Sequence, residues 1–129
     1  MKKRFITLLA IIIIAMPIFT IVTSRAQPRW TLFNSATALC YRNDNFYYAN
    51  ATAGTDVYKM DMDVILYEKG LFTGYSEVSS IHKTIYNYYH TAYCDYTFSS
   101  LKDYKIEMIV TAYTRSGQTE TITVANEYT

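Results

Sequence analysis

A strict alternation of apolar and polar residues runs from Tyr104 to Tyr113 and constrains the fold more than any other part of the chain. One set of alternate positions is largely apolar, namely Tyr104, Ile106, Met108, Val110 and Ala112. The other set is mixed, namely Lys105, Glu107, Ile109, Thr111 and Tyr113. A period of two indicates a half-buried strand, because successive side chains of a strand point to opposite faces of the sheet. The run T-R-S-G at 114–117 then predicts a turn into a second strand.

A second alternation, between Val57 and Lys69, predicts another long strand. Its apolar positions are Tyr58, Met60, Met62, Val64 and Leu66. A helix would require apolar residues three and four positions apart, and this stretch lacks them. Shorter extended runs separated by turn-forming residues occur at 35–42, 46–52, 71–85 and 92–99. About seven short strands without a helical segment predict an all-β chain folded as an antiparallel sandwich.

The first 26 residues have the composition of an export signal. A basic start precedes an apolar run over 5–22, and the small residues Ser24 and Ala26 suit a cleavage site. We expect an N-terminal signal helix within 1–26 and a single β-sandwich domain over 27–129. The alternative is an uncleaved anchor, since the apolar run is at the lower limit of a membrane span. In both cases the domain is expected to be secreted or to lie on the extracellular face of the cell envelope, with membrane contact only through an uncleaved N-terminal segment.

The charge of the expected domain differs from that of the whole chain, which is +1. Four of the 12 Lys and Arg residues lie within the first 26 residues, so eight remain against 11 Asp and Glu. An acidic domain argues against nucleic acid and against an anionic membrane surface as partners.

Cys40 and Cys94 are the only two cysteines, and both lie in the part expected to be exported. In an oxidising compartment such a pair predicts a disulfide. The alternative is two buried free thiols. No histidine lies within close ligand spacing of either cysteine, so no metal site is expected there.

The stretch 98–117 resembles a corner of fibronectin type III and related immunoglobulin-like domains. Those domains carry a large apolar residue six positions before a corner tyrosine, then alternating apolar positions and a glycine turn. The matching residues here are Phe98, Tyr104, Ile106, Met108, Val110, Ala112 and Gly117. The resemblance implies an immunoglobulin-like or fibronectin III-like antiparallel β-sandwich, in which the hydroxyl of Tyr104 bonds back to the backbone. The family's core tryptophan is missing, and the cysteine spacing differs from that of the usual immunoglobulin pair.

The chain as a whole is similar to small exported Gram-positive domains of unknown function. The features that carry this similarity are the export segment, the L-Y-E-K-G hairpin at 66–70 and the T-E-T-I strand at 119–122.

Residues for catalysis or metal binding are few. The only histidines are His82 and His90, and no nucleophile elbow such as G-x-S-x-G frames a serine. Asp61 and Asp63 share a strand face, but no D-x-D-x-D-G loop surrounds them, so a solvated face is expected rather than a Ca²⁺ site. We therefore expect no catalytic residue, no metal and no cofactor, and the chain is not predicted to be an enzyme.

Tyrosine is the most unusual component, with 14 residues that all follow position 26. Tyr86, Tyr88, Tyr89 and Tyr93 form a candidate binding surface, because tyrosine offers rigid amphipathic contact area suited to sugars or protein surfaces. The alternative is a structural role in cross-strand aromatic pairs.

The sequence predicts an exported, non-catalytic module for recognition or structure at the cell surface, with a surface protein or a glycan as partner. One alternative is a carbohydrate-binding module that uses the tyrosine-rich segment. Another is a small secreted enzyme, which would need His82 or His90 beside a carboxylate in a pocket.

Overall fold

The computed structural model describes residues 29–129, so the export signal expected at 1–26 lies outside the described residues. Seven strands make up the fold: β1 (Phe33–Tyr41), β2 (Phe46–Ala53), β3 (Val57–Lys69), β4 (Tyr75–Ile85), β5 (Tyr89–Asp95), β6 (Asp103–Thr114) and β7 (Thr119–Tyr128). Residues 29–129 contain no helix, which confirms the all-β class. Within that range there is accordingly no helix long and apolar enough to cross a membrane.

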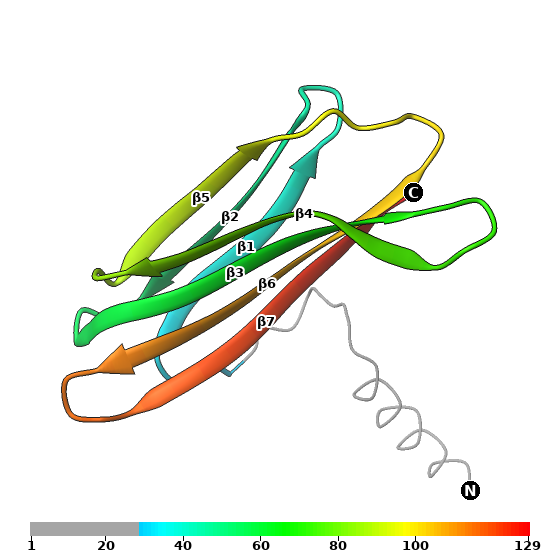
Figure 1. Cartoon of the computed structure of the whole chain (residues 1–129). Coiled ribbons are helices and arrows are strands. Elements are labelled where there is room, and N and C mark those ends of the chain that lie inside the picture. The colour runs from blue at the N-terminus through cyan, green and yellow to red at the C-terminus, as the bar shows by residue number, and fades with distance from the viewer. Residues whose placement is uncertain (1–28) are drawn as a thin grey trace, which may run out of the picture.

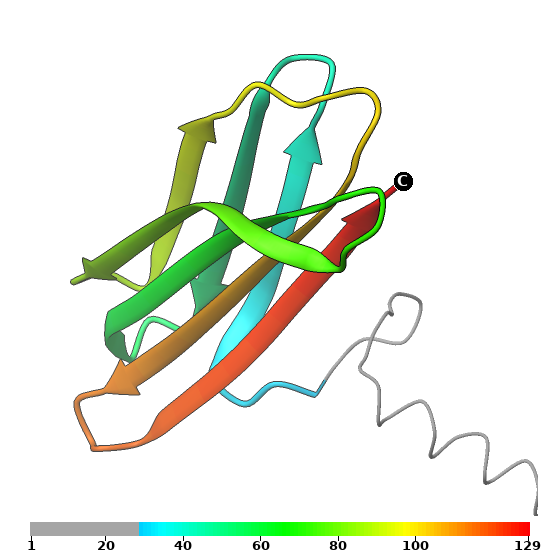
Figure 2. The same cartoon turned by 45° about the vertical axis from the view of Figure 1, so that its right-hand side comes forward.

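The strands form two antiparallel sheets, a three-stranded sheet of order β1-β2-β5 and a four-stranded sheet of order β4-β3-β6-β7. The hairpins β1–β2, β3–β4 and β6–β7 each stay within one sheet, whereas the other connections cross between sheets. Figures 1 and 2 show the two sheets lying face to face. This arrangement is a β-sandwich, as the alternating patterns predict.

The core combines mostly small side chains from one sheet, Tyr47 and Phe33 apart, with large ones from the other. The inner face of the three-stranded sheet carries buried alanines, namely Ala38, Ala49, Ala51, Ala53 and Ala92. The facing sheet carries large fully buried side chains, including Met60, Met62, Val64, Leu66, Ile106, Met108 and Val110. Protein interiors pack almost without voids, so we infer that these large side chains fill the space that the alanines leave.

Two details differ from the predicted strands. Tyr58 is exposed rather than inward-facing, because the pairing of β3 with β6 shifts register between Val57 and Lys59 and buries Val57 instead. The strand expected over 92–99 is displaced to Tyr89–Asp95. The segment after Asp95 is hydrogen-bonded to the turn between β1 and β2. The backbone N–H of Tyr96 donates to the carbonyl of Asn45, and the backbone N–H of Phe98 donates to the side-chain oxygen of Asn45.

Tyr104 lies at the corner where the chain crosses from β5 to β6. Its ring is fully buried and packs edge-on against Phe98, with 4.8 Å between ring centroids. Its hydroxyl accepts a hydrogen bond from the backbone N–H of Ser99 at 2.7 Å and donates to Glu68 Oε2 at 2.9 Å. Burial raises the pKa of Tyr104, so the hydroxyl stays protonated and able to donate. The guanidinium of Arg42 lies 5.5 Å from the ring centroid and donates to the carbonyl of Ser99.

The disulfide expected between Cys40 and Cys94 is absent, and both residues are free thiols. The register explains why: Cys40 lies opposite Tyr47 in the β1–β2 pair, and Tyr47 lies opposite Cys94 in the β2–β5 pair. The two cysteines are thus two strand spacings apart, which places their Cα atoms about 9–10 Å from each other. A disulfide requires Cα atoms within about 7 Å, so strand β2 keeps the pair from closing.

We expect two titratable thiols per chain in denaturant without reductant, and at most one that reacts readily in the folded protein. Cys40 is buried, and burial raises its pKa to about 12, which leaves almost no reactive thiolate. Cys94 is only partly buried, so it should react first. Titration with a chromogenic disulfide reagent, with and without guanidinium, measures both values. A disulfide-linked peptide pair containing both cysteines in a non-reduced digest would contradict this register.

Candidate binding surface

The structure divides the tyrosine segment that the sequence singles out. Tyr86, Tyr89 and Tyr93 are each more than half exposed, whereas Tyr88 packs partly against the core. Tyr86 lies in the connection before β5, and Tyr89 and Tyr93 point outward from opposite halves of that strand. Tyr93 lies four residue steps along the strand from Tyr89, which corresponds to about 13 Å. The four tyrosines therefore do not form one patch.

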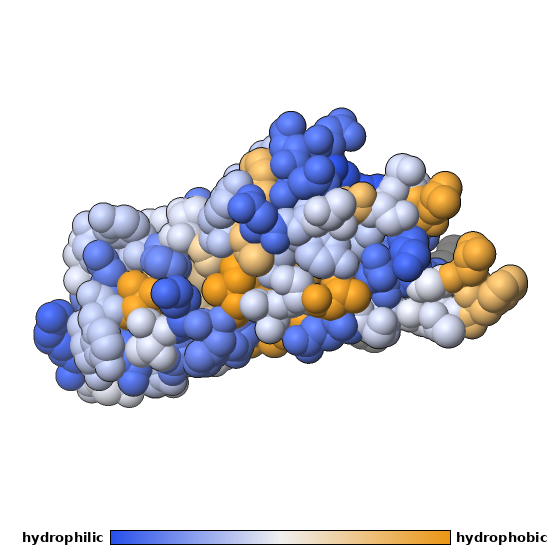
Figure 3. Space-filling view, turned by 45° about the horizontal axis from the view of Figure 1, so that its top comes forward, coloured by the Kyte–Doolittle hydropathy of each residue, from blue (hydrophilic) through white to orange (hydrophobic). Residues whose placement is uncertain are grey.

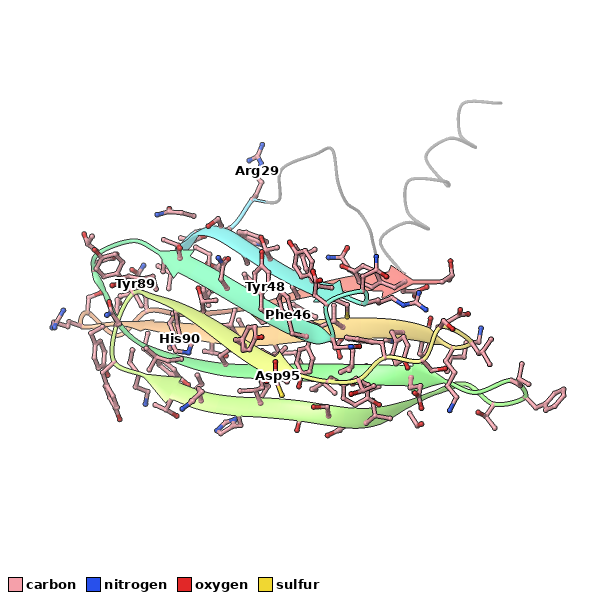
Figure 4. All side chains as sticks on the ribbon, turned by 90° about the horizontal axis from the view of Figure 1, so that it is seen from above. Arg29, Phe46, Tyr48, Tyr89, His90 and Asp95 are labelled. Carbon is pink, nitrogen blue, oxygen red and sulfur yellow. The ribbon has the colours of Figure 1, made fainter. Side chains whose placement is uncertain are left out.

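Tyr93 instead belongs to an aromatic group drawn from three strands on the outer face of the three-stranded sheet. Tyr41 of β1 lies opposite Phe46 of β2, and Tyr48 of β2 lies opposite Tyr93 of β5. We call Tyr41, Phe46, Tyr48 and Tyr93 the outer aromatic cluster. Figure 4 shows Phe46 and Tyr48 close together, with Tyr89 at the far end of the sheet.

The rings of the outer aromatic cluster contact one another. Tyr41 stacks on Phe46 with 4.8 Å between centroids and on Tyr48 with 5.7 Å. Phe46 also lies 4.9 Å from Tyr93. These contacts fix the ring positions, and Tyr41 and Tyr93 nevertheless remain substantially exposed. The result is a rigid aromatic surface rather than four mobile side chains.

Polar groups border the outer aromatic cluster. The hydroxyl of Tyr93 donates to Asp95 Oδ1 at 2.8 Å, and this hydrogen bond is the main cause that raises the pKa of Tyr93. Burial and the neighbouring Tyr41 raise the pKa of Tyr48. Both phenols therefore stay protonated near neutral pH, and each keeps oxygen lone pairs that can accept hydrogen bonds.

An open hollow of about 470 Å³ adjoins the cluster. Its lining comes from the end of β1, the turn after it and the β5–β6 connection, namely Cys40, Tyr41, Arg42, Asn43, Asp44, Phe98, Ser99 and Ser100. Tyr41 belongs to both features, so the aromatic surface and the hollow are continuous. Together they offer apolar ring surface beside carboxylate, amide and hydroxyl groups, a combination suited to binding a ligand that is partly apolar and partly polar.

The outer face of the four-stranded sheet holds the other residues that the sequence singles out. Asp63 pairs with His82 Nδ1, and this hydrogen bond raises the pKa of His82. Asp61 accepts hydrogen bonds from Thr84 and Tyr113. Protein donors thus contact both carboxylates, and residues 29–129 contain no group of three or more His, Cys, Asp or Glu side chains that could hold a metal ion.

The histidines lie apart from the hollow, whose lining contains neither of them. His82 is exposed on an open sheet face. His90 is partly buried on β5, and burial lowers its pKa. The hydroxyl of Thr84, two residues from His82, donates to Asp61 and not to the histidine.

Comparisons of the chain with protein-family models, with curated proteins and with solved structures found no match. The strand order, the corner around Tyr104 and the outer aromatic cluster are therefore the features from which relationship and function are inferred.

Proposed function

We propose that the protein is an exported, non-catalytic module that binds a ligand on the outer face of its three-stranded sheet. The observation that carries this proposal is the outer aromatic cluster, whose rings are fixed by stacking yet open to solvent. Large apolar surface that the described residues leave exposed is a common mark of a binding site. Because the rings are already immobilised, a ligand loses little further side-chain entropy on binding them. Export is inferred from the composition of residues 1–26.

The proposed relationship is to immunoglobulin-like and fibronectin III-like sandwiches. It is supported by the seven strands in two sheets and by the Tyr104 hydroxyl, which bonds to the backbone five residues upstream. A constant-type immunoglobulin domain places its fourth strand beside its fifth. Here β4 instead pairs with β3, so the fourth strand lies in the other sheet. The relationship would therefore be to a variant of the family with this strand order.

A glycan is the ligand that this surface favours. The faces of a sugar ring carry C–H bonds that pack on aromatic rings, and its hydroxyl groups need hydrogen-bond partners at the ring edge. The outer aromatic cluster supplies the rings, and Asp95, Asn43 and Asp44 supply acceptors beside them. A surface protein is the other partner class consistent with an aromatic patch.

We expect Tyr93→Ala and Phe46→Ala each to weaken glycan binding at least tenfold. Truncating an aromatic residue at the centre of a binding surface commonly costs about 2 kcal/mol, which is roughly thirtyfold in affinity. A glycan array with the wild-type protein identifies the ligand, and titration calorimetry then compares the variants.

Tyr58→Ala serves as the matched control, because Tyr58 is an exposed tyrosine on the other sheet. It should leave the affinity unchanged. Equal losses from Tyr58→Ala and Tyr93→Ala would remove the outer aromatic cluster as the site. Wild-type protein that binds neither glycans nor cell-surface proteins would remove the proposed function.

A further inference from the structure

The loop between β3 and β4 carries a projecting apolar tip. Leu71 is 86% exposed and Phe72 is 95% exposed, and we call these two residues the apolar tip. Leu101, on the β5–β6 connection, is 87% exposed. Figure 3 shows hydrophobic surface gathered at the end of the molecule where these two connections lie. No other large apolar side chains among residues 29–129 are as exposed as these three.

The base of the β3–β4 loop is tightly folded. A Cβ atom at Gly70 would lie 2.6 Å from the Oγ1 atom of Thr73, so a larger residue there would require the Thr73 side chain to move. Leu71 and Phe72 fall between these two residues. The apolar tip projects into solvent from this turn.

Tyrosine and lysine side chains surround the base of the loop. The ammonium of Lys105 lies 4.9 Å from the ring centroid of Tyr67 and 5.2 Å from that of Tyr75, and Lys69 lies 5.7 Å from Tyr75. We call these four residues the collar. Within the described part of the chain, neither collar lysine takes part in a salt bridge, although the strand register places Asp103 opposite Lys69 and Glu127 opposite Lys105. Tyrosine and lysine are favoured where a bilayer meets water, because each has an apolar body and a polar end.

We propose that this end of the sandwich inserts into the surface of a phospholipid bilayer. The apolar tip would reach the boundary of the acyl chains, and the lysines of the collar would meet the lipid phosphates. A bilayer accepts a convex apolar tip without a matching cavity, whereas a specific protein interface needs about 800 Å² from each partner. Two or three side chains bury less apolar surface than a single acyl chain, so the contact should be reversible. The proposal does not depend on the outer aromatic cluster or its ligand.

A salt bridge and two backbone hydrogen bonds show that the β3–β4 loop lies at the end of the sandwich opposite to the start of β1. Lys102 forms a salt bridge with Glu68, beside the β3–β4 loop. At the other end, the N–H of Gly54 donates to the carbonyl of Leu32, and the N–H of Ala53 donates to that of Tyr88. The start of β1 and the connection that carries Tyr86 thus lie at the end of the sandwich opposite to the apolar tip.

Tryptophan reporters in the full chain test which end meets the bilayer. The chain has one tryptophan, so Trp30→Phe removes the tryptophan fluorescence of the parent protein. In that background we expect the Phe72→Trp reporter to shift its emission to the blue on adding phosphatidylcholine vesicles, and to be quenched by brominated lipid. The Tyr86→Trp reporter at the opposite end should keep its emission in buffer. All reporters carry the same N-terminal residues, so any insertion of that segment is common to them.

A second comparison tests the apolar tip itself. With a Leu101→Trp reporter, adding Phe72→Ser should raise the lipid concentration for half-maximal quenching by about tenfold or more, since that contact buries a phenylalanine. Adding Ser116→Ala, at the opposite end, should leave that concentration unchanged. An unquenched Phe72→Trp reporter, or equal quenching of the Phe72→Trp and Tyr86→Trp reporters, would overturn the proposal. If the Phe72→Trp reporter were unquenched, a protein partner for the apolar tip would replace the bilayer as the proposed ligand.

Discussion

Replacing Ala49 with leucine is expected to lower the free energy of unfolding by about 2–3 kcal/mol. Ala49 is fully buried at the centre of the three-stranded sheet, between Ala38 on β1 and Ala92 on β5. This row of alanines faces methionine and branched side chains that already fill the interior. A leucine there would have to displace them or force the sheets apart. Urea unfolding followed by circular dichroism measures the change as a shift in midpoint at constant slope.

The neighbouring position supplies the control for Ala49→Leu. Asn50 follows in the same strand but points outward, so Asn50→Leu adds similar bulk to the opposite face and should change stability by no more than about 0.5 kcal/mol. If Ala49→Leu were tolerated as well as Asn50→Leu, the two sheets would have unfilled space between them. The proposed division of the core into an alanine face and a large-residue face would then be wrong.

The strands themselves could be predicted from the sequence where one face is buried. The alternation over 104–112 places the same residues inward that the structure buries, and so does that from Met60 to Leu66. Alternation failed at Tyr58, because β3 has one extra residue there: two steps from Val57 to Lys59 lie opposite a single step from Thr114 to Tyr113. The order of strands within each sheet was beyond reach, since it depends on pairings between residues far apart in the chain.

The cysteine pair shows the limit of arguments from spacing. Two cysteines in an exported chain indicate a disulfide only if the fold brings them together. Cys40 and Cys94 do share the inner face of one sheet, but Tyr47 occupies the strand between them. A one-dimensional spacing carries no information about an intervening strand, and only the register shows it.

The candidate binding surface was predicted in part. Tyr93 belongs to the outer aromatic cluster, but its partners lie on β1 and β2, more than forty residues earlier. Clustering along the chain drew attention to Tyr86 through Tyr93, which the structure disperses. A usable signal was present in β2, where Phe46 and Tyr48 alternate with Tyr47 and the small inward residue Ala49. Two large aromatics on the outward phase of a strand mark an exposed aromatic face.

Replacing Tyr104 with phenylalanine is expected to lower the free energy of unfolding by about 2 kcal/mol. The change keeps the buried ring and removes only the hydroxyl, which accepts from the Ser99 backbone and donates to Glu68. The partly buried N–H of Ser99 would lose its partner, and the carboxylate of Glu68 would lose a donor in a place with limited access to water. The β5–β6 connection would then be held by Arg42, which donates to the carbonyls of Ser99 and Lys102, and by Asn45, which accepts from Tyr96 and Phe98. Chemical unfolding measures the loss.

Tyr113→Phe is the matched control for the corner, because both tyrosines lie on β6 and both hydroxyls donate to a carboxylate. Tyr113 points to the outer face, where water can replace the hydroxyl beside Asp61, so its loss should be no more than about 0.5 kcal/mol. Hydrogen exchange adds a local readout: Tyr104→Phe should deprotect the N–H of Ser99, and Tyr113→Phe should not. Equal effects from the two variants would mean that the crossover between the sheets is fixed by packing of Phe98 on the Tyr104 ring rather than by the hydroxyl. The proposed kinship with fibronectin III-like domains would then lose its most specific support.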